Sequence, residues 1–266
     1  AITNRTKAIV TVHYAGIACD MDKIMAIASK HDLYVVEDAA QAIDSYYTGK
    51  DGVQKPLGTI GHLAAFSFHE TKNIISGEGG MLVINDKRFE ERAEIIREKG
   101  TNRSAFFRGE VDKYGWVDIG SSFLPSDMIA AYLFAQLENI NRIQTKRKEI
   151  WQYYYDGLKY LENQGKIRLP HIPHYATNNA HMFYLLVENS KKRDQLIAEM
   201  KDVGVSCVFH YQALHKSLFY LEKSSTNKTL ENSERYTSKL LRLPLYFQLD
   251  HSDLNIVIKA FNEKIR

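Results

Sequence analysis

Apolar runs and one amphipathic pattern alternate at the start of the chain. Residues 8–14 (AIVTVHY) form a β-rich run, and residues 33–38 (LYVVED) are almost continuously apolar, as in strands that are buried on both faces of a parallel sheet. Between them, residues 21–31 carry apolar side chains at helical spacing, and Asp20 is in position to cap this helix. The pattern predicts a strand–helix–strand crossover unit over residues 8–38.

The α/β pattern continues beyond this unit. Strands are predicted over residues 62–70 (HLAAFSFHE) and 81–85 (MLVIN), and the glycines of residues 76–80 (SGEGG) predict a turn between them. A charged helix is expected over residues 86–99, and residues 48–59 are expected to be a loop.

The second half of the chain shows weaker patterns. Residues 100–125 are rich in Gly, Ser and aromatic residues and are predicted to be irregular. Ser126 is a natural N-cap for a long helix that we expect to reach about Leu161, with room for one break. The remaining predictions are strands over 181–188 and 205–211, a polar stretch over 216–232, and helices over 191–204, 231–243 and 254–265.

These elements predict an α/β protein with a mainly parallel sheet. The chain has 266 residues, of which 44% are hydrophobic and 25% charged, so it can bury a core in one or two domains. Gly165 and the nearby prolines mark a boundary. We therefore expect a large domain over residues 1–125, a connecting helical region over 126–164, and a smaller α+β domain over 165–266.

Charge and cysteine content exclude several classes of function. A net charge of +3 is too small to indicate nucleic-acid or acidic-membrane binding. No signal peptide is recognised, and no apolar run reaches the roughly 18 residues of a membrane span. Cys19 and Cys207 lie far apart, and the 10 histidines show no metal-ligand spacing. We expect a cytoplasmic protein without a metal site.

Three features in sequence order indicate a particular chemistry. Asp38 ends an apolar strand, Ser67 and Lys72 follow the next apolar run, and the glycine turn comes directly after them. A lysine in a partly apolar pocket loses its proton readily and can form a Schiff base with a carbonyl. Pyridoxal phosphate (PLP) requires such a lysine, a carboxylate beside its ring nitrogen, and donors for its phosphate. Each residue taken singly is more often a cap, a salt-bridge partner or a surface lysine.

Longer blocks of the sequence show a resemblance to a known family. EDAAQA (37–42), FSFHETKN (66–73), GEGGMLVIND (77–86), the long block 93–127 and NAHMFY (179–184) are similar to the signature blocks of the DegT/DnrJ/StrS sugar aminotransferases. The resemblance covers essentially the whole chain. It implies a fold-type I PLP-dependent transferase that acts on nucleotide-linked keto sugars.

The resemblance implies roles for four residues. Lys72 matches the Schiff-base lysine, and Asp38 matches the partner of the pyridine nitrogen. Gln41 matches the residue at the 3-hydroxyl side of the ring, and Ser67 matches a phosphate-binding hydroxyl. One branch of the family carries histidine in place of the lysine and performs dehydration, so Lys72 indicates transamination.

Four further residues are candidates for substrate binding. Arg103 and Arg108 lie in the aromatic-rich stretch 102–116, where a guanidinium suits a diphosphate and a neighbouring ring could stack on a base. His210 and Tyr211 end a predicted strand, in a region that the resemblance puts near the sugar pocket. For all four, simple packing is the alternative interpretation.

The resemblance also implies which partners the protein has and how much of the large domain the chain contains. We expect a homodimer that takes a nucleotide-linked 4-keto-6-deoxy sugar and an amino-acid donor, with L-glutamate as the expected donor, for surface-polysaccharide synthesis. The alternatives are a non-catalytic or regulatory member of the same fold, and an aminotransferase for another nucleotide sugar. Family members carry a segment before the position of Ala1 that includes part of the phosphate site. The large domain is therefore expected to be incomplete at its N-terminus, and residues 1–266 alone to bind PLP poorly.

Overall fold

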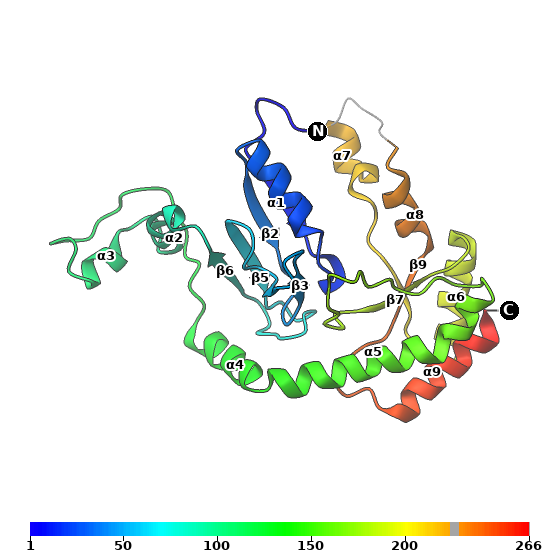
Figure 1. The fold of residues 1–266 in the computed structure, drawn as a ribbon. Coiled ribbons are helices and arrows are strands. Elements are labelled where there is room, and N and C mark those ends of the chain that lie inside the picture. Colours follow the sequence, from blue (N-terminus) through cyan, green and yellow to red (C-terminus); the bar gives the residue numbers. More distant parts are fainter. Residues whose placement is uncertain (224–228, 266) are drawn as a thin grey trace. The chain divides into compact units, whose positions relative to one another are not determined.

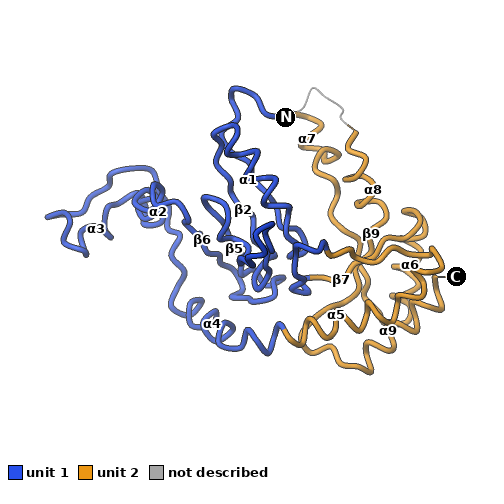
Figure 2. Tube along the Cα trace, viewed as in Figure 1, with its two compact units in different colours: residues 1–144, 173–181 blue, residues 145–172, 182–266 orange. Residues whose placement is uncertain are grey.

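The chain divides into two compact units. The computed structural model describes residues 1–223 and 229–265, drawn in Figure 1. Unit 1 comprises residues 1–144 and 173–181, and unit 2 comprises residues 145–172 and the chain from Met182 onward (Figure 2). These bounds differ from the expected domains because one long helix runs through the boundary and because residues 173–181 return to unit 1.

The main sheet of unit 1 contains the predicted crossover unit. It consists of β1 (Ala8–Val12), β2 (Tyr34–Asp38), β5 (Leu63–Ser67) and β6 (Gly80–Ile84), in that spatial order. Strands β1, β2 and β5 are parallel, and β6 is antiparallel to β5. Helix α1 (Met21–Lys30) connects β1 to β2, and the side chain of Asp20 caps it by accepting a hydrogen bond from the main-chain N–H of Lys23 at 3.2 Å. The strand–helix–strand prediction is therefore confirmed.

The two faces of this sheet differ in burial. On one face, Val35 packs in a core cluster with Met21 and Ala28 of α1. On the other face, the strand register aligns two rows of side chains, because successive residues of a strand point to opposite sides. These rows are Val10, Val36, Leu63 and Ile84, and then Val12, Asp38, Ala65 and Leu82. Val10 is 64% exposed and Leu82 is 54% exposed, so this second face is open in the described chain.

A small hairpin replaces most of the loop expected over residues 48–59. Strands β3 (Tyr46–Thr48) and β4 (Gln54–Pro56) pair antiparallel around a turn in which Gly52 has φ 75°. The segment 173–181 then bonds to the first of these strands, since Thr177 N–H donates to Tyr46 O at 3.1 Å. This long-range pairing explains why the segment belongs to unit 1.

Helices follow the main sheet. They are the 3₁₀ turn η2 (Lys87–Phe89), α2 (Glu90–Arg97), α3 (Arg103–Phe107), α4 (Asp127–Glu138) and α5 (Ile140–Asn163). Ser126 caps α4 as predicted, by accepting a hydrogen bond from Ile129 N–H at 3.4 Å. The long helix breaks once, at Asn139. Within the residues that the structure describes, no helix combines the length and hydropathy of a membrane span.

Unit 2 is built on an antiparallel sheet of strand order β7-β9-β8. Its strands are β7 (Phe183–Leu186), β8 (Val208–Phe209) and β9 (Leu240–Leu243). Its helices are the major part of α5, then α6 (Ser190–Asp202), η3 (Leu214–Lys216), α7 (Leu218–Lys223), α8 (Glu231–Lys239) and α9 (His251–Lys264). Residues 224–228 of the predicted polar stretch lie outside the described residues.

One predicted helix is too long. The helix expected over residues 231–243 ends at Lys239, and residues 240–243 form the middle strand of the unit 2 sheet. Leu240, Leu241 and Leu243 are all buried, and β9 pairs with strands on both of its sides. A short apolar run fits either element, so the sheet partners decide its conformation.

Candidate active site

The predicted residues Asp38 and Ser67 lie at one edge of the unit 1 sheet. Asp38 is the last residue of β2, and its register partner in β5 is Ala65. Ser67 lies two residues beyond Ala65 and ends β5. Because side chains alternate along a strand, Asp38 and Ser67 share the open face, at the carboxyl ends of adjacent parallel strands. Ligands of open α/β sheets bind beyond these ends.

The Asp38 carboxylate retains hydrogen-bonding capacity. It is half-buried, and its Oδ1 atom accepts a hydrogen bond from Ala40 N–H at 3.1 Å. Within the described chain this is the only hydrogen bond of the side chain, so Oδ2 can accept a proton donor from a ligand. The strand itself is anchored on both sides, since His13 N–H donates to Asp38 O at 3.0 Å and Ala39 N–H donates to Ala65 O at 2.9 Å.

Lys72 lies in the connection between β5 and β6. This connection is compact, because Lys72 N–H donates to His69 O at 2.9 Å and Ser76 N–H donates to Phe68 O at 2.7 Å. Lys72 is half-buried, and within the residues described its amine forms no ion pair. The predicted glycine turn is present, and a Cβ atom on Gly80 would lie 2.8 Å from Phe66 O, so only glycine fits there.

Gln41 and Ser67 each have a side-chain hydrogen-bond donor available for a ligand. The Oε1 atom of Gln41 accepts a hydrogen bond from Ala15 N–H at 2.6 Å, which leaves the amide N–H groups of the side chain to donate. The Oγ atom of Ser67 accepts from His69 N–H at 3.4 Å, and its own O–H can donate to an anion.

The residues present fit the chemical demands of PLP. Asp38 offers a carboxylate for a protonated ring nitrogen, and Gln41 and Ser67 offer donors for oxygen atoms. Lys72 offers a primary amine in the connection that follows the same strand as Ser67. Unit 1 therefore contains all four predicted cofactor residues. Within the described residues, no three His, Cys, Asp or Glu side chains are arranged to hold a metal ion.

The buried acid Glu37, next to Asp38, was not among the residues predicted from the sequence. Glu37 accepts hydrogen bonds from His13 Nε2 at 2.9 Å and from the main-chain N–H groups of Gly58 at 2.8 Å, Ile60 at 2.7 Å and Gly61 at 2.6 Å. Burial raises the pKa of this carboxyl, but these hydrogen bonds outweigh burial and hold the pKa below its usual value. Glu37 is therefore an ionised anchor beneath the candidate site.

The tautomer of His13 follows from its contacts. The Nδ1 atom accepts a hydrogen bond from Cys19 N–H at 3.2 Å, so Nε2 is the nitrogen that carries a proton and donates to Glu37. This pair ties the end of β1 to β2. The available sequence signal was strand alternation, which places Glu37 on the covered face when Asp38 is on the open one.

The substrate candidates Arg103 and Arg108 are both engaged with acids of unit 1. Arg103 lies 3.6 Å from Glu98. Arg108 donates two hydrogen bonds to Glu94, both at 2.9 Å, and another to Glu110 at 2.7 Å. Hydrogen bonding to Glu110 and Glu94 raises the already high pKa of Arg108. A diphosphate would have to displace these carboxylates, so a substrate role for the two arginines stays a prediction.

His210 and Tyr211 belong to unit 2, directly after β8. Burial, together with the charge of Arg242, lowers the pKa of His210 to about 4, so its ring is neutral near pH 7. The Tyr211 ring is exposed, with the Arg242 guanidinium 6.0 Å from its centroid. Their contact with a sugar also stays a prediction.

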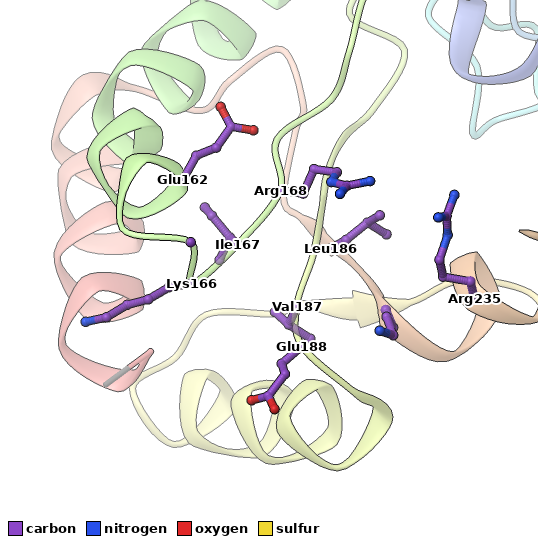
Figure 3. A pocket seen from close by; sticks show the side chains of 10 residues that line it. Glu162, Lys166, Ile167, Arg168, Leu186, Val187, Glu188 and Arg235 are labelled. Atoms are coloured by element: carbon purple, nitrogen blue, oxygen red, sulfur yellow. The ribbon is translucent and has the colours of Figure 1, made fainter.

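Unit 2 contains a surface cavity of about 540 Å³ (Figure 3). Its wall includes Arg168 and Arg235, together with Glu162 and Glu188. None of the predicted site residues lines it. Glu162 forms an ion pair with Lys159 at 2.6 Å, so part of the polar lining is occupied by internal pairing.

The α/β fold is that of the aminotransferases, and its sheet presents an acid and a hydroxyl at adjacent parallel strand ends, followed by a lysine. The profile of the DegT/DnrJ/EryC1/StrS aminotransferase family matches residues 1–262, and the chain belongs to this family of sugar aminotransferases. The fold-class prediction is confirmed.

Relatives support this assignment. The chain is 33% identical over 267 residues to "Uncharacterized protein MJ1066" of Methanocaldococcus jannaschii, with 98% of this chain and 67% of the relative covered. It is similar to DesV of S. venezuelae, solved in complex with a ketimine intermediate, with 29% identity, a TM-score of 0.85, and coverage of 100% and 67%. It shares its fold with Spr1654 of Streptococcus pneumoniae, with 23% identity, a TM-score of 0.86, and coverage of 99% and 70%.

The relatives also differ from this chain in length, and one of them was solved with and without cofactor. Spr1654 was solved in PLP, PMP and apo forms. The chain spans about two thirds of the length of each of these relatives.

Proposed function

We propose that this protein is a PLP-dependent transaminase of a nucleotide-linked 4-keto-6-deoxy sugar. The observation that carries the proposal is the shared open sheet face of Asp38 and Ser67, with Lys72 in the connection that follows. The proposed reaction converts dTDP-4-keto-6-deoxy-D-glucose to dTDP-4-amino-4,6-dideoxy-D-galactose, with L-glutamate as donor. Support for this sugar is the resemblance of residues 93–127, 208–215 and 240–246 to dTDP-4-amino-4,6-dideoxygalactose transaminase.

Lys72 and Asp38 perform the central tasks of the proposed reaction. Bound PLP would supply the carbonyl carbon that takes up the amino group and a ring that accepts electrons. Lys72 would hold the cofactor through its amine and would move protons at the reacting carbon. Asp38 would keep a proton on the ring nitrogen, because an ionised carboxylate next to a cationic N–H stabilises the charged form.

Gln41 and Ser67 orient the cofactor. The Gln41 amide would donate to the ring oxygen, and it is held in place because its Oε1 atom accepts a hydrogen bond from Ala15 N–H. The Ser67 hydroxyl donates toward the phosphate. Together with the lysine and the aspartate, they would hold the cofactor in one orientation.

The proposal is tested by trapping. The protein is mixed with PLP, reduced with borohydride and mapped by peptide mass spectrometry. The reduced adduct is expected on Lys72, to be absent from Lys72→Ala, and to be unchanged in the exposed control Lys50→Ala. An adduct on a different lysine of the wild-type protein would contradict the proposal.

The substrate is tested separately. Turnover is measured against a panel of nucleotide keto sugars with L-glutamate as donor. The dTDP-4-keto-6-deoxyglucose arm is expected to give the highest kcat/KM. If another sugar is preferred, the protein is an aminotransferase for that sugar. If no sugar reacts although Lys72 is trapped, the protein is a non-catalytic member of the fold.

A further inference from the structure

Asn179 connects two segments that are remote from it in sequence. Its side chain is fully buried, and its Nδ2 atom donates to Gln41 O and to Ile43 O, each at 2.8 Å. Its main-chain oxygen accepts a hydrogen bond from Asn73 Nδ2 at 2.8 Å. Asn73 is the neighbour of Lys72. One residue therefore bonds directly to the Gln41 segment and to the Lys72 segment.

Asn73 uses its whole side chain in this network. Its Nδ2 atom also donates to Gln144 Oε1 at 2.9 Å, and its Oδ1 atom lies 2.8 Å from His181 Nδ1. The amide orientation is determined, because Nδ2 faces two oxygen acceptors. The Oδ1 atom can only accept, so His181 Nδ1 carries the proton. All of these side chains are buried.

The network holds a single geometry. A buried donor or acceptor that loses its partner costs about 1–3 kcal/mol, so the amides cannot shift independently. Asn179 is also enclosed, since a Cβ atom on Gly16 would lie 2.0 Å from its Oδ1 atom. His181, two residues further along the chain, donates its main-chain N–H to the same Oδ1 atom at 3.0 Å.

Lys72 lies next to this network in the chain. Within the described residues, its amine forms no ion pair, and its main chain is held by the turn to His69. The adjacent Asn73 bonds the turn to Gln144, Asn179 and His181 of unit 1. Packing alone would not require amides here, because an apolar core avoids their desolvation cost.

We propose that Asn73 and Asn179 are positioning residues that hold the Lys72 connection in register with Gln41. The inference rests on the proposed function, because the consequence of this register is the orientation of the lysine toward the cofactor. Neither residue touches the reacting atoms. They raise the fraction of molecules in which the connection adopts the conformation that orients Lys72 toward the cofactor.

The direct test is hydrogen exchange in the protein without cofactor. Asn73→Ala and Asn179→Ala are expected to speed exchange of the amides of residues 68–77 about tenfold, from the loss of buried hydrogen bonds. Asn85→Ala is the matched control, because Asn85 likewise donates to two main-chain oxygens of unit 1, Gly58 O at 3.0 Å and Gly61 O at 2.9 Å. It is expected to leave exchange in residues 68–77 unchanged.

A kinetic readout separates positioning from general stability. With all variants folded at the assay temperature, Asn73→Ala and Asn179→Ala are expected to lower kcat at least tenfold while KM for the keto sugar stays within about twofold, as for an interaction made only in the transition state. If Asn73→Ala does not fold, Gln144→Met takes its place, because it removes the hydrogen bonds that Gln144 forms with Asn73 Nδ2 and with Asn179 O.

The outcomes distinguish this inference from the proposed function. Faster exchange in residues 68–77 with both network variants, without it in Asn85→Ala, supports the inference. Unchanged exchange, or equal acceleration by the control, overturns it. Failure of the proposed function appears elsewhere, as absence of a borohydride-trapped adduct on Lys72 of the wild-type protein.

Discussion

The buried carboxylate of Glu37 accepts a hydrogen bond from His13 Nε2 at 2.9 Å, and both side chains are fully enclosed. Three main-chain N–H groups of residues 58–61 complete the ring of donors around this acid. Glu37 precedes Asp38 in β2 and points to the opposite face. The anchor therefore holds the strand end that presents Asp38.

Removal of the charge at this anchor is expected to destabilise the protein. In Glu37→Gln, an N–H₂ group takes the place of one carboxylate oxygen and faces N–H donors to which it cannot act as an acceptor. The hydrogen bonds that remain no longer involve a negatively charged acceptor. We expect a loss of about 2–4 kcal/mol in the free energy of unfolding, measured by urea denaturation. Glu91→Gln, at an exposed position of α2, is the control and is expected to stay within about 0.5 kcal/mol of wild type.

The same anchor predicts a pH dependence. The pKa of Glu37 is lowered in the folded protein, so its contribution is present above the ordinary glutamate pKa of about 4.3 and is lost as pH falls through the lowered value. The difference in unfolding free energy between wild type and Glu37→Gln is expected to shrink upon acidification below about pH 4.3. A difference that stays constant through this range would show that Glu37 is not the group responsible.

The substitution Asp38→Asn removes the negative charge of this side chain and keeps its shape. The amide oxygen can still accept from Ala40 N–H, so the melting temperature is expected to change little. Without the carboxylate the ring nitrogen of the cofactor loses its proton, and transamination is expected to slow by several powers of ten with a smaller loss in cofactor affinity. Turnover and cofactor titration are measured on the same preparation. Near-normal turnover would refute the role of Asp38.

A homodimer is expected to form through the apolar stretch that follows the sheet. Ile119 is 80% exposed and Met128 is 84% exposed, and such exposed apolar residues mark interaction surfaces. Sedimentation of the protein is expected to give twice the monomer mass, and Ile119→Lys with Met128→Lys to give monomers. Ile256→Lys, which changes a 54% exposed isoleucine of α9 with no other strongly exposed apolar residue beside it in the described sequence, is the control and is expected to leave the dimer intact. A fully active wild-type monomer would contradict the proposal.

Residues 1–266 expressed alone are expected to hold PLP weakly. The face that carries Asp38 and Ser67 is open in the described chain, with Val10 and Leu82 exposed beside it. A ring bound there would lack a wall on one side and remain in contact with water. The measurement is the visible absorbance of PLP that remains after dialysis. Stoichiometric retention would show that this face suffices for binding.

The sequence by itself determined the elements whose burial follows a local period. Strands β1 and β2, helix α1 and its Asp20 cap were predicted because each pattern repeats within a few residues. The order of Asp38, Ser67, Lys72 and the glycine turn was also visible, because strand ends and turns have local composition. Placing these ends at one edge required only that successive strands be parallel.

Tertiary structure decided what depends on partners far away in the chain. The run Leu240–Leu243 became a strand because β7 and β8 offered hydrogen bonds on both sides. Glu37 became a buried anchor because His13 and a loop more than 20 residues away supplied its donors. Asn179 reached Gln41 and Asn73 across 138 and 106 residues. Such contacts leave no periodic signal, since the free energy of a buried polar group depends on which partner the fold brings to it.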